Sequence, residues 1–176
     1  FSGVQIYDVI QDKELNYWFS TNEGLIFYDH YSFQKIECSE SKSVSFFNFV
    51  INSSGTIYCN NLNNQIFSIR GKSCELFYEL LPDERRNDVS LATSVENNLL
   101  IAGKKLIVLN ESGSVLQRAE LNLGYIGFPF CKKNKDLIYS ASNADSLLIF
   151  SQGNLSVSEL IYRNGRKQNE LGVLQF

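Results

Sequence analysis

A repeated pattern of turns and short apolar strands most constrains how this chain can fold. The pattern is clearest in QDKELNYWFSTNEGLIFYD, residues 11–29, which reads as a turn, an aromatic-rich strand, a tight turn and another strand. Three weaker copies appear when Trp18 is aligned with Tyr58, Ile101 and Tyr139. The aligned positions lie 40, 43 and 38 residues apart, which indicates strands that recur between loops of variable length.

Each copy is preceded by an apolar strand and followed by a more polar one. Four strands in roughly 40 residues are typical of a β-propeller blade, whereas a β-sandwich would not produce such internal similarity. We therefore predict an all-β fold of about four four-stranded antiparallel blades plus one extra strand, in a single partial β-propeller domain over residues 1–176. The expected blades span residues 4–41, 45–86, 88–122 and 124–162, and residues 171–176 would form the opening strand of a next blade.

The extra strand favours an arc of a larger propeller over a four-bladed ring closed by a swapped strand. The sequence contains no Met, so we expect Phe1 to be an internal residue of a longer chain, with any signal peptide or anchor outside it. An open arc leaves sheet edges and apolar faces between blades uncovered. We therefore expect the isolated chain to self-associate through these exposed propeller edges.

Composition and charge argue against a nucleic-acid surface. The net charge is −3, and the densest basic group is the short set Arg163, Arg166 and Lys167. No apolar run approaches the roughly 20 residues that span a bilayer. We expect membrane attachment only through segments outside this chain.

The four cysteines, Cys38, Cys59, Cys74 and Cys131, are not arranged in CxxC pairs, and the chain has a single His. This pattern does not match a zinc site, and we expect neither a metal nor a cofactor. Four cysteines allow three disulfide pairings, among which the sequence cannot choose. Because free Cys is among the most buried residue types, we expect buried, unpaired thiols.

The first block resembles the two-component regulator propeller repeat, with an Asp-containing turn, a Trp-bearing strand, a Thr, a Gly-Leu pair and an aromatic-Asp pair. These elements are Asp12, Trp18, Phe19, Thr21, Gly24, Leu25, Tyr28, Asp29 and Phe33, and block two retains Asn52, Gly55 and Tyr58.

The resemblance implies a periplasmic part of an inner-membrane receptor, namely the input region of a hybrid or classical sensor histidine kinase of Bacteroidetes-type bacteria. It also implies a signal ligand that is commonly carbohydrate-derived and a kinase outside this chain.

Two positions depart from the repeat, which normally has Gly where this chain has Leu15 and His30. Gly serves at such points because it adopts φ > 0 without steric cost. His tolerates that region moderately well, but Leu does not. We therefore expect the turn at Leu15 to have changed type.

Most of the polar residues in these blocks have a structural interpretation. Asp12 and Asn52 lie at equivalent turn entries, where their side chains accept backbone N–H groups, and Asp29 is expected to cap a turn in the same way. Trp18 is expected in the core, with an exposed aromatic that stacks on a ligand as the alternative. His30 and Tyr31 are candidate rim contacts for a ligand.

No catalytic device is expected. His30 would have to serve any His-dependent mechanism, and no GxSxG or comparable nucleophile motif occurs. The acidic pairs Glu37/Glu40 and Asp83/Glu84 are expected to be solvated loop charges. The sequence favours a non-enzymatic sensor module, and the alternatives are a protein-interaction scaffold and a carbohydrate-active propeller enzyme such as a lyase or glycosidase.

Overall fold

The computed structural model describes residues 3–87, 89–94 and 96–120, and beyond them the backbone of five strands between residues 126 and 169. The chain divides into two compact units, Phe1–Glu120 and Leu121–Phe176, which are described separately. None of the described residues forms a helix, and so no described helix could cross a membrane.

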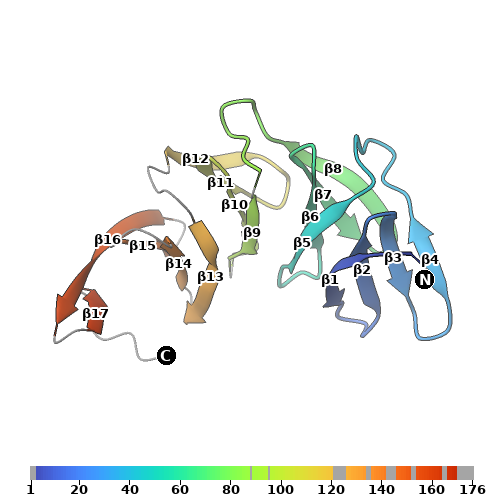
Figure 1. The fold of residues 1–176 in the computed structure, drawn as a ribbon, viewed down its shortest axis with the longest axis horizontal. Helices are drawn as coiled ribbons and strands as arrows, with labels where there is room; N and C mark the ends of the chain where they lie inside the picture. Colours follow the sequence, from blue (N-terminus) through green and yellow to red (C-terminus); the bar gives the residue numbers. More distant parts are fainter. Residues whose placement is uncertain are drawn as a thin grey trace. The chain divides into compact units, whose positions relative to one another are not determined.

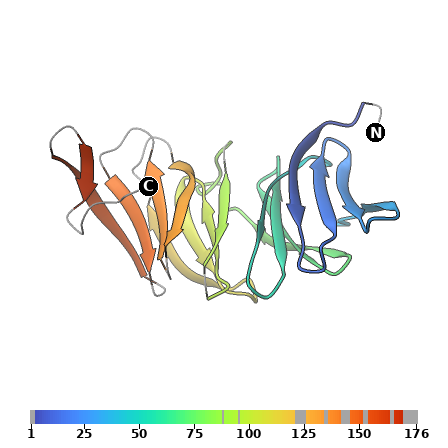
Figure 2. The ribbon, with the colours of Figure 1, turned by 90° about the horizontal axis from the view of Figure 1, so that it is seen from below.

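The first unit contains three four-stranded antiparallel sheets that follow one another along the chain (Figures 1 and 2). In each, the strands are ordered as in the sequence, as expected for a propeller blade. Blade 1 comprises β1 (Ile6–Gln11), β2 (Tyr17–Thr21), β3 (Gly24–Tyr28) and β4 (Phe33–Ile36). Blade 2 comprises β5 (Phe46–Ile51), β6 (Ile57–Asn61), β7 (Gln65–Arg70) and β8 (Ser73–Glu79), and blade 3 comprises β9 (Ser90–Thr93), β10 (Leu99–Ala102), β11 (Lys105–Leu109) and β12 (Val115–Glu120).

The second unit contains one five-stranded antiparallel sheet. Its strands are β13 (Ile126–Lys133), β14 (Asp136–Ala141), β15 (Ser146–Ser151), β16 (Asn154–Arg163) and β17 (Arg166–Asn169). The fifth strand, β17, pairs antiparallel with β16. The strand predicted over residues 171–176 lies outside the described residues.

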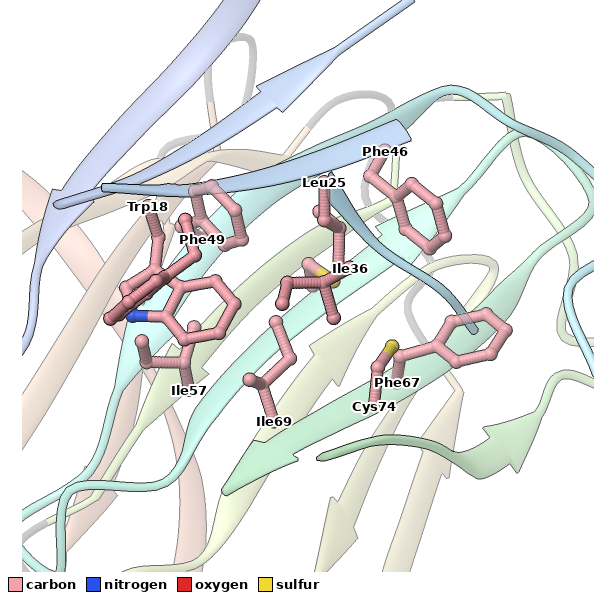
Figure 3. Close-up of a cluster of buried hydrophobic side chains, with 11 residues drawn as sticks. Trp18, Leu25, Ile36, Phe46, Phe49, Ile57, Phe67, Ile69 and Cys74 are labelled. Atoms are coloured by element: carbon pink, nitrogen blue, oxygen red, sulfur yellow. The ribbon is translucent and has the colours of Figure 1, made fainter. Parts of the chain in front are cut away.

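The blades of the first unit pack face to face because their strands are apolar on both sides. In β6, Ile57 and Cys59 belong to the core shared with blade 1, whereas Tyr58 belongs to the core shared with blade 3. Figure 3 shows the first of these cores, where Trp18 from blade 1 lies over Ile57 from blade 2. Burying one such side chain stabilises the fold by about 1.5–3 kcal/mol, and the two clusters together hold blades 1–3 in one unit.

The turn between the first two strands has the same geometry in all three blades. The N–H of its first residue donates to the carbonyl oxygen four residues later, at 2.9 Å for Asp12 to Asn16, 3.0 Å for Asn52 to Thr56 and 2.9 Å for Ser94 to Asn98. The fourth residue of each turn has positive φ: 68° at Leu15, 95° at Gly55 and 63° at Asn97. The expectation of a changed turn at Leu15 was therefore wrong, since Leu15 keeps the turn and adopts the strained conformation itself.

The register predicted for the third repeat was also wrong, by one residue. Counting from the equivalent turns aligns Trp18 and Tyr58 with Leu100. Ile101 lies on the opposite face of β10, in the core shared with blade 2. A slip of one residue exchanges the two faces of a strand, and in β10 all four residues are buried and aliphatic, so no polar residue marks the face.

Two of the cysteines form a disulfide, contrary to the expectation of unpaired thiols. Cys38 follows β4 of blade 1 and is bonded to Cys74 in β8 of blade 2. Cys59 is a free, buried thiol, as expected. The side chain of Cys131 lies outside the described residues.

Candidate functional site

The described structure has a pocket of about 470 Å³ at one end of the first unit, where hairpin turns of all three blades meet. Glu14 comes from the β1–β2 turn, Ser54 to Thr56 from the β5–β6 turn, and Glu111 from the β11–β12 turn. Arg70 and Gly71 end β7 and begin the turn to β8. A site built from turns on a rigid sheet scaffold is a common arrangement for ligand binding.

The turn residues are held in place by side-chain caps. The Asn52 Oδ1 accepts the backbone N–H groups of Ser54 at 3.1 Å and Thr56 at 2.9 Å. Asn110 accepts those of Ser112 at 3.1 Å and Ser114 at 2.9 Å. These are Asx-turns, and they fix the segments that carry Ser54 and Glu111.

Glu111 connects blade 3 to blade 2 at the pocket. Its Oε1 accepts the Ser54 hydroxyl at 2.8 Å and the Asn52 side-chain amide at 3.1 Å. The backbone carbonyl of Glu111 accepts the Arg70 Nη2 at 3.1 Å. Glu111 therefore contacts both the β5–β6 turn and the end of β7 in the neighbouring blade.

Arg70 is the cationic group of the pocket. Its Nε donates to the Thr56 hydroxyl at 3.3 Å, and Nη2 donates to the Glu111 carbonyl. A guanidinium has five N–H donors in a fixed plane, so two contacts set its orientation and leave further donors for a ligand. The Glu14 carboxylate is exposed on the blade 1 side of the same pocket.

A buried tyrosine hydroxyl lies close to these charges. Tyr58 is fully buried, and its hydroxyl lies near the Arg70 side chain without reaching the geometry of a good hydrogen bond. Burial raises the Tyr58 pKa, the Arg70 charge opposes this rise and the Glu111 charge reinforces it. The Arg70 side chain, which lines the pocket, is therefore also the nearest polar partner of the Tyr58 hydroxyl.

The lining of the pocket combines hydrogen-bond donors and acceptors. Two carboxylates flank one guanidinium, an arrangement that can accept and donate hydrogen bonds at once. Across the described ranges, no three His, Cys, Asp or Glu side chains are grouped to hold a metal ion. The pocket is therefore a candidate site for a polar ligand.

Gly55 of the predicted repeat lines this pocket, but the three candidate ligand contacts predicted from the sequence do not. Trp18 is only 1% exposed, and its indole N–H donates to Asp12 Oδ2 at 3.1 Å, so its ring offers no surface to a ligand. His30 has φ 71° and donates from Nε2 to the Leu15 carbonyl at 2.8 Å. Tyr31 is 95% exposed in the neighbouring β3–β4 turn.

The two aspartates that were predicted to cap turns do accept backbone N–H groups with their side chains. Asp12 Oδ1 accepts the Asn16 N–H at 2.8 Å. Asp29 Oδ1 accepts the N–H groups of Ser32 at 2.8 Å and Tyr31 at 3.1 Å. These N–H groups, Ser32 first, lower the pKa of Asp29.

One of the acidic pairs differs from the expectation of solvated loop charge. Asp83 is exposed and pairs with Lys105 at 2.8 Å, but Glu84 is only 1% exposed. Glu84 accepts the Leu81 N–H at 2.8 Å and the Arg118 Nε at 2.9 Å, and the Tyr78 hydroxyl also donates to it. A buried carboxylate requires such partners, and Arg118, 34 residues away in sequence, could not be recognised as one beforehand.

Sequence reasoning missed the pocket residues Glu14, Arg70 and Glu111. Each is a charged residue next to or inside a turn, which is the ordinary place for a solvated charge. The available signal was that Arg70 is the only charged residue of its strand, QIFSIR. These three residues come together only through the contacts between blades, which the sequence does not show.

Comparison with known proteins shows the fold. No protein-family model matches the chain, and no curated protein matches its sequence. Among solved structures, it is similar to inactive virginiamycin B lyase H270A from Staphylococcus aureus, crystallised with quinupristin (TM-score 0.70, 12% identity, 92% of this chain and 57% of that one).

Two further solved structures represent other classes of protein. One is the extracellular domain of BT3049 from B. thetaiotaomicron, assigned to the hybrid two-component systems (TM-score 0.64, 16% identity, 87% of this chain and 23% of that one). The other is XC5397, a gluconolactonase from Xanthomonas campestris (TM-score 0.58, 10% identity, 86% of this chain and 61% of that one). The chain thus spans less than two thirds of each neighbour. It is an all-β partial propeller, whose first unit consists of three four-stranded antiparallel blades.

Proposed function

We propose that this chain is part of an extracytoplasmic sensor propeller, and that the pocket at Arg70 and Glu111 takes the signal molecule. The observation that carries the proposal is the structural likeness to the extracellular domain of a two-component system protein over 87% of this chain. The first repeat points the same way, since it resembles the two-component regulator propeller repeat. In this proposal the chain itself is not an enzyme, and it regulates a histidine kinase outside these residues.

The disulfide supports a location outside the cytoplasm. Cys38–Cys74 connects blades 1 and 2. Disulfides form and persist in oxidising compartments and are rare where thiol reductants are maintained. A periplasmic part of an inner-membrane receptor is such a setting.

The proposed ligand is a carbohydrate-derived molecule. The pocket offers the Arg70 guanidinium as donor and the Glu14 carboxylate as acceptor, and both can engage neighbouring hydroxyl groups. An acidic sugar would gain in addition a charge-assisted bond to Arg70. Ligand binding would then favour one of two arrangements of the full receptor, and so change kinase output.

Thermal-shift measurements with a panel of neutral and acidic oligosaccharides test the binding proposal. We expect one class of oligosaccharide to raise the melting temperature of the parent chain, and Arg70→Gln to abolish the rise. Lys42→Gln is the matched control, because it removes an exposed positive charge that does not line the pocket. A shift that Arg70→Gln leaves intact would place the ligand elsewhere.

A second candidate is a propeller enzyme, favoured by the likeness to virginiamycin B lyase and to a gluconolactonase. The same oligosaccharide mixtures, analysed by mass spectrometry after incubation, separate the two candidates. Intact oligosaccharides together with a thermal shift support the sensor. Cleaved or rearranged products that disappear in the Arg70→Gln variant would support the enzyme instead.

A further inference from the structure

One face of blade 1 repeats, position by position, the faces that are buried in blades 2 and 3. The strand pairings align Phe19 and Ile26 of blade 1 with Cys59 and Phe67 of blade 2. The same pairings align them with Ile101 and Ile107 of blade 3. These positions face the preceding blade wherever a preceding blade is described.

In blades 2 and 3 this face is closed. Cys59 and Phe67 are 0% exposed beneath blade 1, and Ile101 and Ile107 are 0% exposed beneath blade 2. In blade 1 the corresponding Phe19 is only partly buried. The adjoining Val9 is 52% exposed, whereas its counterparts Phe49 and Leu91 are 8% and 3% exposed.

The uncovered face consists largely of aromatic side chains. The Tyr17 and Phe19 rings lie 6.5 Å apart between centroids, and the Tyr28 and Phe33 rings stack at 4.3 Å. Contiguous apolar surface of this kind on a soluble domain marks an interaction site. Because the same positions are an established interface in the next two blades, the blade 1 face has the shape and chemistry of an interface between blades.

We propose that this face binds a further propeller blade supplied by the same polypeptide. The covering blades already described define what that blade presents. On the face that covers the next blade, each of them has a central aromatic residue, which is Trp18 in blade 1 and Tyr58 in blade 2. The same face carries an aliphatic residue of the third strand, which is Leu25 in blade 1 and Ile66 in blade 2.

The outer strand adds a charge requirement. In blade 1, Lys35 of β4 pairs with Ile26 of the third strand. In blade 3, Arg118 of β12 pairs with the equivalent residue, Ile107, so Lys35 and Arg118 occupy the same position. Arg118 donates to Glu84, which lies in the loop after β8 of the covering blade 2. The counterpart in blade 2 is the uncharged Leu76, so blade 3 is the precedent for a charged pair, and we expect the blade that covers blade 1 to place an acidic side chain opposite Lys35.

Cys59 makes a matched test possible, because this free thiol occupies in blade 2 the position that Phe19 occupies in blade 1. In a Cys131→Ser background, Phe19→Cys places a second free thiol at the uncovered counterpart. The natural full-length protein is treated with a maleimide under non-reducing conditions, and labelling is assigned by peptide mass. Leu116→Cys, at a position that is 56% exposed, is the accessible control.

We expect the introduced thiol and Cys59 both to react more than about tenfold more slowly than the thiol of the Leu116→Cys control, because labelling of a covered thiol requires local opening. The protection is expected to be independent of protein concentration. Labelling at the rate of the exposed control would overturn the proposal. Protection that disappears on dilution would also overturn it, since it would show that a second copy covers the face.

A second variant identifies the covering segment. It also keeps a large side chain at position 19, so the test works even if the Phe19→Cys chain fails to fold. Phe19 is replaced by photoreactive p-benzoylphenylalanine, which retains an aromatic ring, and the crosslinked peptide is sequenced. We expect a crosslink to a four-strand repeat of the same chain with an aromatic residue at the position of Trp18. A crosslink to a segment without this repeat would exclude a blade as the occupant.

Discussion

Cys38 and Cys74 join two blades that are also held together by their apolar faces. The Cα atoms of the two residues are 5.0 Å apart, although 36 positions separate them in the sequence. Cys74 lies in the core that blades 1 and 2 share, and Cys38 packs against the same core. The covalent bond therefore reinforces an interface that burial has already formed.

Removing this disulfide with Cys38→Ser and Cys74→Ser together is expected to lower the free energy of unfolding by about 4 kcal/mol, because the crosslink closes a loop of this length in the unfolded chain. Urea unfolding monitored by Trp18 fluorescence provides the measurement. Dithiothreitol should bring the parent to the stability of the double variant and leave the double variant unchanged. If dithiothreitol left the stability of the parent unchanged, the result would contradict a disulfide between Cys38 and Cys74.

Leu15→Gly is expected to stabilise the chain by about 1 kcal/mol, because a non-Gly residue in the left-handed region is strained. Leu15 has φ 68° and its side chain is 61% exposed, so little packing is lost. The reciprocal change, Gly55→Leu in the equivalent turn, should destabilise, since φ is 95° there and a Cβ would also lie 3.3 Å from Lys13 Cδ. Equal midpoints of urea unfolding for Leu15→Gly and the parent would argue against strain at this turn.

Arg118→Met is expected to lower the free energy of unfolding by about 1–3 kcal/mol, since it removes the charged partner of the buried Glu84 carboxylate. Lys42→Met serves as the control, because its ion pair with Glu79 is largely exposed and such pairs contribute little. A cycle with Glu84→Gln should show coupling between Arg118 and Glu84. Additive effects of the two substitutions would show that the ion pair makes no independent contribution.

Stability should fall in acid partly through Asp29. Backbone N–H groups of Ser32 and then Tyr31 hold the pKa of Asp29 below its usual value. A carboxyl group whose pKa is lowered by folding stabilises the protein above its unfolded pKa of about 3.9, and this stabilisation is lost as the pH falls through the folded pKa.

Asp29→Asn keeps an oxygen acceptor for both N–H groups but does not titrate. Urea unfolding at a series of pH values below about 5 should therefore show a shallower loss of stability than in the parent. The half-buried carboxyl of Glu79 and the exposed carboxyl of Asp83 supply part of the remaining dependence, because hydrogen bonds from Lys42 and Lys105 lower their pKa values. Parallel curves for variant and parent would exclude a contribution from Asp29.

The repeat in the sequence predicted the strands of blades 1 and 2 well, because local signals mark both ends of each strand. Asp12 and Asn52 begin equivalent turns, and apolar or aromatic residues follow at the spacing of a short strand. In blade 3 these signals weakened, since Ser94 caps the turn and Leu99 to Ala102 are all apolar. The strand was still found, but its register was not.

The candidate site was much less predictable, because its residues come from three blades. Glu14, Arg70 and Glu111 are separated by 56 and 41 positions, and each resembles an ordinary turn charge. Trp18 is in the core, as expected, and its 1% exposure excludes the alternative of an aromatic that stacks on a ligand. The composition of a segment does not show which of its side chains will meet the side chains of another blade.

The sequence alone determined that this chain forms short antiparallel sheets in a propeller-like repeat, since turns and strand patterning are local properties. Only the tertiary structure decided which face of each strand is covered, that Cys38 pairs with Cys74, that Glu84 is buried against Arg118, and that three hairpin turns form a pocket. These features depend on how one sheet packs on the next, and that packing is set by side chains tens of residues apart. The aromatic face of blade 1 shows both levels, because the sequence supplies its side chains and comparison with blades 2 and 3 shows that such a face is an interface.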